Sequence, residues 1–318
     1  VDARGAHAHR PRGRLKEAAR LPGDGGSAIA PAMDANSTHL QPSDDVVLDL
    51  SANQSWADRH REAWRDVREG LAQWRLIWTL AWLDIRLRYR GSMLGPFWLT
   101  ISTGAMVFAM GLLYSLLFKL ELRQYIPFLA LSLVLWGFLG TLVSDSCIAF
   151  TSNEGLIRSV RMPFTLYAAR IVVRNLVVLA HNALVVVVVY LLLWSWPGGV
   201  AALALPGMLL WLVNAVAVSL LLGTICTRLH DIPPIVASVM QMAFFMSAVI
   251  WKPSQLGELE WTLAFNPFFS LLEVVRGPLM GVVPSDLILG SALAYSAALW
   301  LVTWLVFARV RGRIAFWL

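Results

Sequence analysis

The chain has 318 residues, of which 58% are hydrophobic and 14% are charged. About a quarter of the residues of a soluble domain are charged, so this composition excludes an ordinary soluble protein and indicates a membrane protein. The net charge of +6 does not indicate nucleic-acid binding, because the lysines and arginines fall outside the apolar runs, where they suit lipid headgroups. We interpret Cys147 and Cys226 as small buried hydrophobic residues.

The first 55 residues predict a disordered N-terminal tail. They are rich in Gly, Pro, Ala, His, Asp and Ser and show no apolar periodicity. The first residue is Val1, and Met33 begins a more ordinary sequence, so we expect part of residues 1–32 to be upstream or added sequence.

A basic amphipathic helix is predicted over residues 56–92. Its apolar residues recur at spacings of three, four or seven and form one stripe: Trp64, Val67, Leu71, Trp74, Trp78 and Ile85. Most of its arginines lie off this stripe, which suits a helix in the headgroup plane of a membrane. The alternative is a soluble helix packed on a partner. We favour the membrane interface because an apolar run follows almost immediately.

Six apolar runs follow, each suited in length to crossing a bilayer as a helix. They occupy residues 97–118, 126–150, 175–195, 200–226, 233–251 and 287–308. The sequence therefore predicts an all-α integral membrane protein with a six-span domain over residues 93–318. Arginines concentrate after the second, fourth and sixth runs, so the positive-inside rule predicts that both termini are cytoplasmic.

The connection over residues 252–286 is predicted to form short re-entrant helices on the outer side. Its apolar pieces are too short to span because four residues break them: Pro267, Gly277, Pro278 and Gly281. Glu273 and Arg276 lie three residues apart, so one helical turn would bring their charges together.

No motif for enzyme chemistry is present in the sequence. It contains no G-x-x-x-x-G-K-[ST], H-E-x-x-H or G-x-S-x-G pattern, so we expect neither catalysis nor a bound cofactor or metal. Polar residues within the runs are either functional or serve helix contacts, and we favour contacts. We expect Asp145 to pair with Arg170 or Arg174, and four others to bond across helices: His181, Asn182, Asn214 and Gln241.

Three segments resemble the membrane subunits of ABC transporters that export polysaccharides such as O-antigen, teichoic acid, capsule or cell-wall galactan. Residues 87–98 (LRYRGSMLGPFW) resemble the entry to that family's first span. Residues 226–231 (CTRLHD) resemble its Arg-x-x-Asp turn, and residues 265–276 (FNPFFSLLEVVR) its Asn-Pro…Glu-x-x-Arg segment. The resemblance covers residues 56–318 in the family's order. One departure is Ser102-Thr-Gly104, where many members carry a proline.

The resemblance implies a permease that works as a homodimer with two cytoplasmic ABC ATPase subunits, which would bind ATP and Mg. It further implies a bacterial inner (plasma) membrane location and a polyprenyl-pyrophosphate-linked polysaccharide as cargo, moved from the inner to the outer leaflet. The alternative is a related permease that exports a drug or another lipid.

The resemblance also implies roles for particular residues. Arg86, Arg88 and Arg90 would bind the lipid pyrophosphate; a topology signal with anionic-lipid contact explains them equally well. A coupling helix near residues 152–163 would dock the ATPase, capped by a Ser or Asn at its start and limited by Pro163. The ATPase-docking candidates are Glu154, Arg158, Arg161, Arg228 and Asp231. The residues that the resemblance assigns to the re-entrant segment are Asn266, Pro267, Glu273 and Arg276.

Aromatic residues of the first and fifth runs would line a glycan conduit, because ring faces suit the apolar faces of sugars. The alternative is packing against lipid or neighbouring helices. The candidates are Phe97, Trp98, Phe108, Tyr114, Phe118, Phe244, Phe245 and Trp251.

Overall fold

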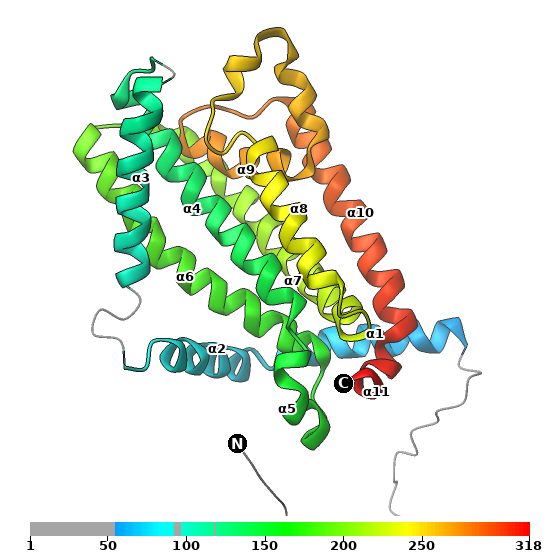
Figure 1. Ribbon diagram of the computed structural model, residues 1–318. Coiled ribbons are helices and arrows are strands. Elements are labelled where there is room, and N and C mark those ends of the chain that lie inside the picture. Colours follow the sequence, from blue (N-terminus) through cyan, green and yellow to red (C-terminus); the bar gives the residue numbers. More distant parts are fainter. Residues whose placement is uncertain (1–54, 92–96, 118) are drawn as a thin grey trace, which may run out of the picture. The chain divides into compact units, whose positions relative to one another are not determined.

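The computed structural model describes residues 55–91, 97–117 and 119–318. All regular secondary structure in these residues is helical (Figure 1). The predicted N-terminal tail, apart from Ser55, and the conduit candidate Phe118 lie outside the described residues.

Within the described residues, five helices are long and apolar enough to cross a membrane: α3 (Phe97–Leu117), α4 (Leu122–Cys147), α6 (Phe164–Leu193), α7 (Ala204–Arg228) and α10 (Asp286–Val310). The fifth of the six predicted runs forms α8 (Ile232–Met246), which has only 15 residues. This is fewer than the roughly 20 residues of a typical span. The helix ends early because the backbone turns at Ala248, whose φ is 50°.

The remaining helices gather at the two ends of these long ones (Figure 1). At one end lie α1 (Trp56–Ala72), α2 (Trp74–Arg88), α5 (Glu154–Ser159), α11 (Ile314–Trp317) and the C-terminus. At the opposite end lie η3 (Pro253–Phe265) and α9 (Pro267–Leu279). Three short 3-10 turns complete the path: η1 (Thr151–Asn153), η2 (Gly198–Leu203) and η4 (Arg311–Arg313).

The predicted amphipathic helix over residues 56–92 is two helices in the structure, separated at Gln73, whose ψ is 34°. Both run across the end of the bundle (Figure 1). They pack through residues that are mostly small or aliphatic: Ala63, Asp66, Gly70, Ile77, Ala81 and Ile85. Most of the apolar stripe predicted from the sequence is exposed instead, including Trp64, Trp74 and Trp78. The chain itself therefore leaves this stripe available for lipid or a partner, and its membrane position stays a prediction.

The core is built around α4. Every residue from Tyr125 to Trp136 is buried, because α3, α6, α7, α8 and α9 all contact this helix. The Trp136 ring meets Phe244 of α8 and Phe268 of α9 edge-on, with centroids 5.8 and 5.9 Å away. The α4 helix thus ties the short helix α9 to the bundle.

Candidate functional site

Three arginines mark the end of α2, directly before the undescribed residues that lead into α3. Arg86 and Arg88 lie in the last helical turn, where cations complement the helix dipole, and Arg90 follows it. All three are exposed. The Arg86 guanidinium lies 5.8 Å from the centre of the Trp82 ring. These arginines share the end of the molecule that carries α5 (Figure 1).

Arg88 contacts a network of four charged side chains from α2, α4 and α6. Asp84 of α2 accepts two hydrogen bonds from Arg170 of α6, one of them from Nε at 2.7 Å. Arg174, one turn along α6, places Nη2 2.8 Å from Asp145 of α4 and Nη1 3.6 Å from Asp84. The network confirms the expected pairing of Asp145 with Arg174, and it places Arg170 on Asp84 instead. Arg88 Nη2 lies 3.7 Å from Asp145 Oδ1 at the edge of the network.

The predicted coupling helix corresponds to α5 and the preceding η1 turn. Asn153 stands at the N-cap position of α5, but its side chain makes no cap hydrogen bond, contrary to the sequence expectation. Its amide oxygen instead accepts a hydrogen bond of 2.9 Å from Arg170 Nη1. Glu154 and Arg158 form a pair of 2.9 Å on the surface of α5. Arg161 is also exposed, so the segment presents a charged face.

The second docking candidate lies at the turn between α7 and α8. The Arg228 guanidinium lies 5.1 Å from the centre of the Trp317 ring in α11. Asp231 occupies the N-cap position of α8 without a side-chain cap hydrogen bond. Both residues are exposed, so their side chains are accessible to a partner.

At the opposite end, Arg276 of α9 is one of the most buried large side chains, with 1% of its surface exposed. It binds Glu273 Oε2 through Nε at 2.8 Å and Nη2 at 2.5 Å, which confirms the pairing expected from their spacing. Its Nη1 donates to the Ala248 carbonyl at 2.7 Å and to Ser132 Oγ at 3.0 Å. The Phe128 ring lies 4.7 Å from the guanidinium. Arg276 therefore joins α9 to α4 and to the turn that ends α8.

The start of α9 is fixed by the Asn-Pro pair. Asn266 Oδ1 accepts hydrogen bonds from the backbone nitrogens of Phe268 and Phe269 at 3.0 and 3.3 Å. Its amide nitrogen donates to Ser247 Oγ at 3.0 Å. Pro267 occupies the first helical position, where no backbone donor is needed. The segment thus begins a helix and holds the end of α8 at the same time.

The conduit candidates divide into exposed and packed residues. Four are exposed on α3 and α8: Phe97, Trp98, Phe108 and Phe245. Tyr114 and Phe244 are partly buried against the core, and the indole of Trp251 donates to the Phe245 carbonyl at 2.9 Å. Both α3 and α8 contact α4. Within the described residues, the exposed rings are therefore available to lipid or to another chain.

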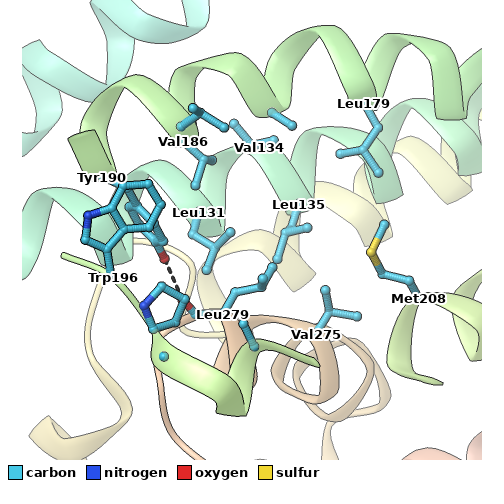
Figure 2. A pocket seen from close by; sticks show the side chains of 15 residues that line it. Leu131, Val134, Leu135, Leu179, Val186, Tyr190, Trp196, Met208, Val275 and Leu279 are labelled. Carbon is cyan, nitrogen blue, oxygen red and sulfur yellow. Dashed lines mark hydrogen bonds between the residues drawn. The ribbon is translucent and has the colours of Figure 1, made fainter. Parts of the chain in front are cut away.

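An apolar cavity of about 570 Å³ is lined by residues of α4, α6, α7 and α9 and of the segment that joins α6 to α7 (Figure 2). Leu131, Leu135 and Val275 are among its lining residues, and Trp196 lies at its edge. The Tyr190 hydroxyl donates to the Leu279 carbonyl at 2.8 Å and so joins α6 to α9 beside the cavity. Its lining contains no charged side chain, so it suits hydrocarbon and not phosphate.

Sequence analysis missed the role of Asp66 on α1, which is buried. Its Oδ1 accepts from the backbone nitrogen and hydroxyl of Thr165 at 2.9 and 2.8 Å, and its Oδ2 from the Phe164 nitrogen at 3.1 Å. Arg311 Nε also donates to Oδ2 at 2.8 Å. One carboxylate thus caps the start of α6 and binds the turn after α10. An acidic residue between Ala63 and Gly70, on the small-residue face, was the available sequence signal.

Two of the four polar residues that were expected to bond across helices do so, Asn214 and Asn182. Asn214 donates to Ser296 Oγ at 2.7 Å, and Thr100 donates to Asn182 Oδ1 at 3.5 Å. His181 Nδ1 instead lies 2.7 Å from the Val177 carbonyl of its own helix. Gln241 is exposed on α8. Both cysteines are free and buried, as expected.

The helices define a multi-pass membrane protein. A family model described as ABC-2 type transporter matches residues 75–280, and the chain belongs to this family. The family implies an ABC ATPase as partner and a transport subunit without its own catalysis. The matched region includes α2, the charged network, α5 and α9.

The chain is also similar to two curated proteins, both named O-antigen export system permease protein RfbA. The Myxococcus xanthus protein is 29% identical over 216 residues, which cover 65% of this chain and 81% of that protein. The Klebsiella pneumoniae protein is 24% identical over 201 residues, which cover 59% and 74%. These relatives and the family match confirm the resemblance to polysaccharide-export ABC permeases.

Proposed function

We propose that this chain is the membrane-spanning subunit of an ATP-driven exporter that moves a polyprenyl-pyrophosphate-linked polysaccharide from the inner to the outer leaflet. It would act as a homodimer with two ATPase subunits in a bacterial inner membrane, with both termini in the cytoplasm. The observation that carries the proposal is the cluster Arg86, Arg88 and Arg90, exposed at the end of the molecule that also carries α5.

Guanidinium groups suit a pyrophosphate because each can donate two parallel hydrogen bonds to phosphate oxygens. Within the described residues, neither Arg86 nor Arg90 forms an ion pair with a carboxylate, and Arg88 has only the contact of 3.7 Å to Asp145. Their donors are therefore available to a headgroup while the polyprenyl chain stays in the bilayer. The exposed stripe of α1 and α2 suits the membrane surface beside them.

Movement of the ATPase subunits would reach the permease through α5, whose half-buried Glu154 and exposed Arg158 offer charges of both signs. A second contact would form at Arg228 and Asp231. The exposed rings of α3 and α8 would face the glycan path between two copies of the chain, where aromatic faces accept sugars without fixing them.

The alternative cargo, a drug or another lipid, is favoured by one observation. The cavity in Figure 2 accepts hydrocarbon and offers no cation to a phosphate. An exporter whose cargo binds only in such a cavity would not need the arginines of α2. Stimulation of the ATPase by a pyrophosphate-linked cargo should therefore depend on these arginines, and stimulation by a drug or another lipid should not.

The test is the ATPase rate of the chain in liposomes with its ABC ATPase subunit, with and without lipid-pyrophosphate-linked glycan. We expect the glycan-bearing lipid to stimulate the rate more than the bare lipid does. Replacing Arg86 and Arg90 together by Gln should raise the half-stimulating concentration by about tenfold or more, since a charge-assisted hydrogen bond contributes about 1.5–3 kcal/mol.

Arg75→Gln is the matched control. This residue also lies on α2 and its guanidinium lies 5.6 Å from the centre of a tryptophan ring, that of Trp74, but it stands at the other end of the helix. It should leave the half-stimulating concentration unchanged. A rate that ignores the glycan-bearing lipid, or equal losses in both variants, would contradict the proposed function.

A further inference from the structure

The charged network beside α2 has a surplus of one positive charge. Asp84, Asp145, Arg170 and Arg174 carry two charges of each sign, and their side chains are only 14–16% exposed. Arg88 adds a third cation and is 45% exposed. The buried members therefore neutralise one another, while Arg88 is the member from which an anion can be reached.

The contacts of this network are of two kinds. Each aspartate has one close guanidinium partner: Arg170 on Asp84, through Nε at 2.7 Å, and Arg174 on Asp145 at 2.8 Å. The other two contacts are long, 3.7 Å from Arg88 to Asp145 and 3.6 Å from Arg174 to Asp84. Ion pairs at these distances are weaker than the short ones, so they break first when a competing anion binds the guanidinium.

Arg174 is the branch of the network, since it is the residue that touches both aspartates. Its Nε is buried and has no hydrogen-bond partner among the described residues. A change in the charge around Asp145 therefore alters how Arg174 is shared between Asp145 on α4 and Asp84 on α2. Asn175, which donates to Asp145 at 2.9 Å, holds that carboxylate on its other side.

The network reaches α5 through Asn153. Arg170 binds Asp84 with Nε and Nη2 and binds the Asn153 amide oxygen with Nη1 at 2.9 Å. Asn153 also donates to the Ala149 carbonyl at 2.8 Å, so its position is fixed at the start of α5. A continuous set of polar contacts thus runs from Arg88 to the docking helix.

We propose that this network couples anion binding at Arg88 to the position of α5. A pyrophosphate that binds Arg88 bidentately removes it from Asp145, and Arg174 then moves toward Asp145 and away from Asp84. Asp84 is left with Arg170 as its partner, which shifts the guanidinium that holds Asn153. By linkage, a movement of α5 imposed by the ATPase changes the affinity at Arg88 by the same factor. The inference rests on the proposed function.

Asn153→Ala tests the coupling, because it removes the contact to α5 and leaves every ion pair of the network in place. Ser159→Ala is the matched control on α5: its hydroxyl donates to the Leu156 carbonyl at 3.2 Å and, among the described residues, contacts no member of the network. The complete permease–ATPase complex is reconstituted in phosphatidylethanolamine liposomes. Two quantities are measured: the binding of undecaprenyl pyrophosphate without nucleotide, and the stimulation of the ATPase rate by the same lipid carrying the glycan.

We expect Asn153→Ala to bind the lipid with unchanged affinity. Its stimulation should fall to less than about a fifth of the original value, because a coupling free energy of about 1–3 kcal/mol corresponds to a factor of about five or more. Ser159→Ala should keep both the affinity and the stimulation. The shift in lipid affinity between the nucleotide-free and ATP-bound complex should also disappear in Asn153→Ala. Stimulation equal to that of the original protein would overturn the inference.

Two further outcomes are distinguishable. If the original complex binds the lipid but glycan-bearing lipid does not stimulate it, the proposed function fails, whatever the variants do. If Asn153→Ala does not co-purify with the ATPase, Asn153→Asp decides, because it keeps an oxygen acceptor for Arg170. Retained stimulation in Asn153→Asp supports the coupling, and loss of stimulation with intact assembly overturns it.

Discussion

Replacing Asp66 by Ala should destabilise the protein more than the loss of any exposed carboxylate. The Asp66 side chain is fully buried and accepts four hydrogen bonds, from Phe164, from Thr165 twice and from Arg311. Removing one partner of a buried ion pair costs about 3–5 kcal/mol. Arg311 keeps a contact of 3.4 Å to Glu62, so we expect the lower end, about 3 kcal/mol.

The assay is thermal unfolding of the purified chain in detergent, followed by the helical circular dichroism signal. A loss of about 3 kcal/mol should lower the midpoint by about 6–12 °C. Asp58→Ala is the control on the same helix, because Asp58 is half exposed and its contact to Arg61 measures 3.6 Å. Exposed pairs contribute less than about 1 kcal/mol.

Equal midpoints for the Asp66 and Asp58 variants would refute the conclusion that α1 holds the start of α6. A double replacement of Asp66 and Arg311 gives an independent check. If the two side chains act as a pair, the double variant should lose less stability than the sum of the single ones. An additive result would show that the backbone cap, and not the ion pair, accounts for the effect.

Three further variants test the end of the bundle that carries α9, by the same unfolding assay. Arg276→Met leaves the mostly buried Glu273 without its cation and should cost about 3–5 kcal/mol; an unchanged midpoint would contradict this. Gly207→Ala would place a Cβ 2.8 Å from the Val274 carbonyl oxygen, so α7 and α9 must move apart at a cost of about 1–3 kcal/mol, whereas Gly290→Ala, in open space, should cost little. Asn266→Ala should cost about 1 kcal/mol and speed hydrogen exchange in the first turn of α9; unchanged exchange there would refute the cap.

The features that the sequence predicted well are those in which the interacting residues are close along the chain or form long uniform runs. Glu273 and Arg276 pair because three residues separate them on one helix. The cap of α9 by Asn266 was not predicted, although the Asn-Pro pair that forms it is an equally local signal. The long apolar runs identify the membrane helices because each span is set by its own composition.

The features that it missed depend on contacts between distant residues. Asp66 and Arg311 lie at opposite ends of the described chain, and neither has a local pattern that names the other. The break at Gln73 carries no Gly or Pro, and the buried positions Gly70 and Ile77 on either side stay in helical phase. The early end of α8 depends on Arg276, which binds the Ala248 carbonyl from a different helix.

The expectation that Asn153 caps α5 was wrong, again because a distant residue makes the contact. Asn at the start of a helix usually bonds to its own backbone, but here Arg170 supplies a charged donor to its oxygen. A charge-assisted hydrogen bond is stronger than a neutral one, so the tertiary contact replaces the local cap. Charge spacing along one helix did not reveal this, because the network draws on three helices and the turn before α5.

Export of a lipid-pyrophosphate-linked polysaccharide can be measured as transport in sealed liposomes that contain the chain and its ABC ATPase. ATP is supplied outside, and the glycan-bearing lipid begins in the outer leaflet, which stands for the cytoplasmic side. We expect ATP to make the labelled glycan inaccessible to an external glycosidase. The double replacement of Arg86 and Arg90 by Gln should slow this protection. Glycan that stays fully accessible with ATP, in liposomes whose ATPase is active, would contradict the proposed export function.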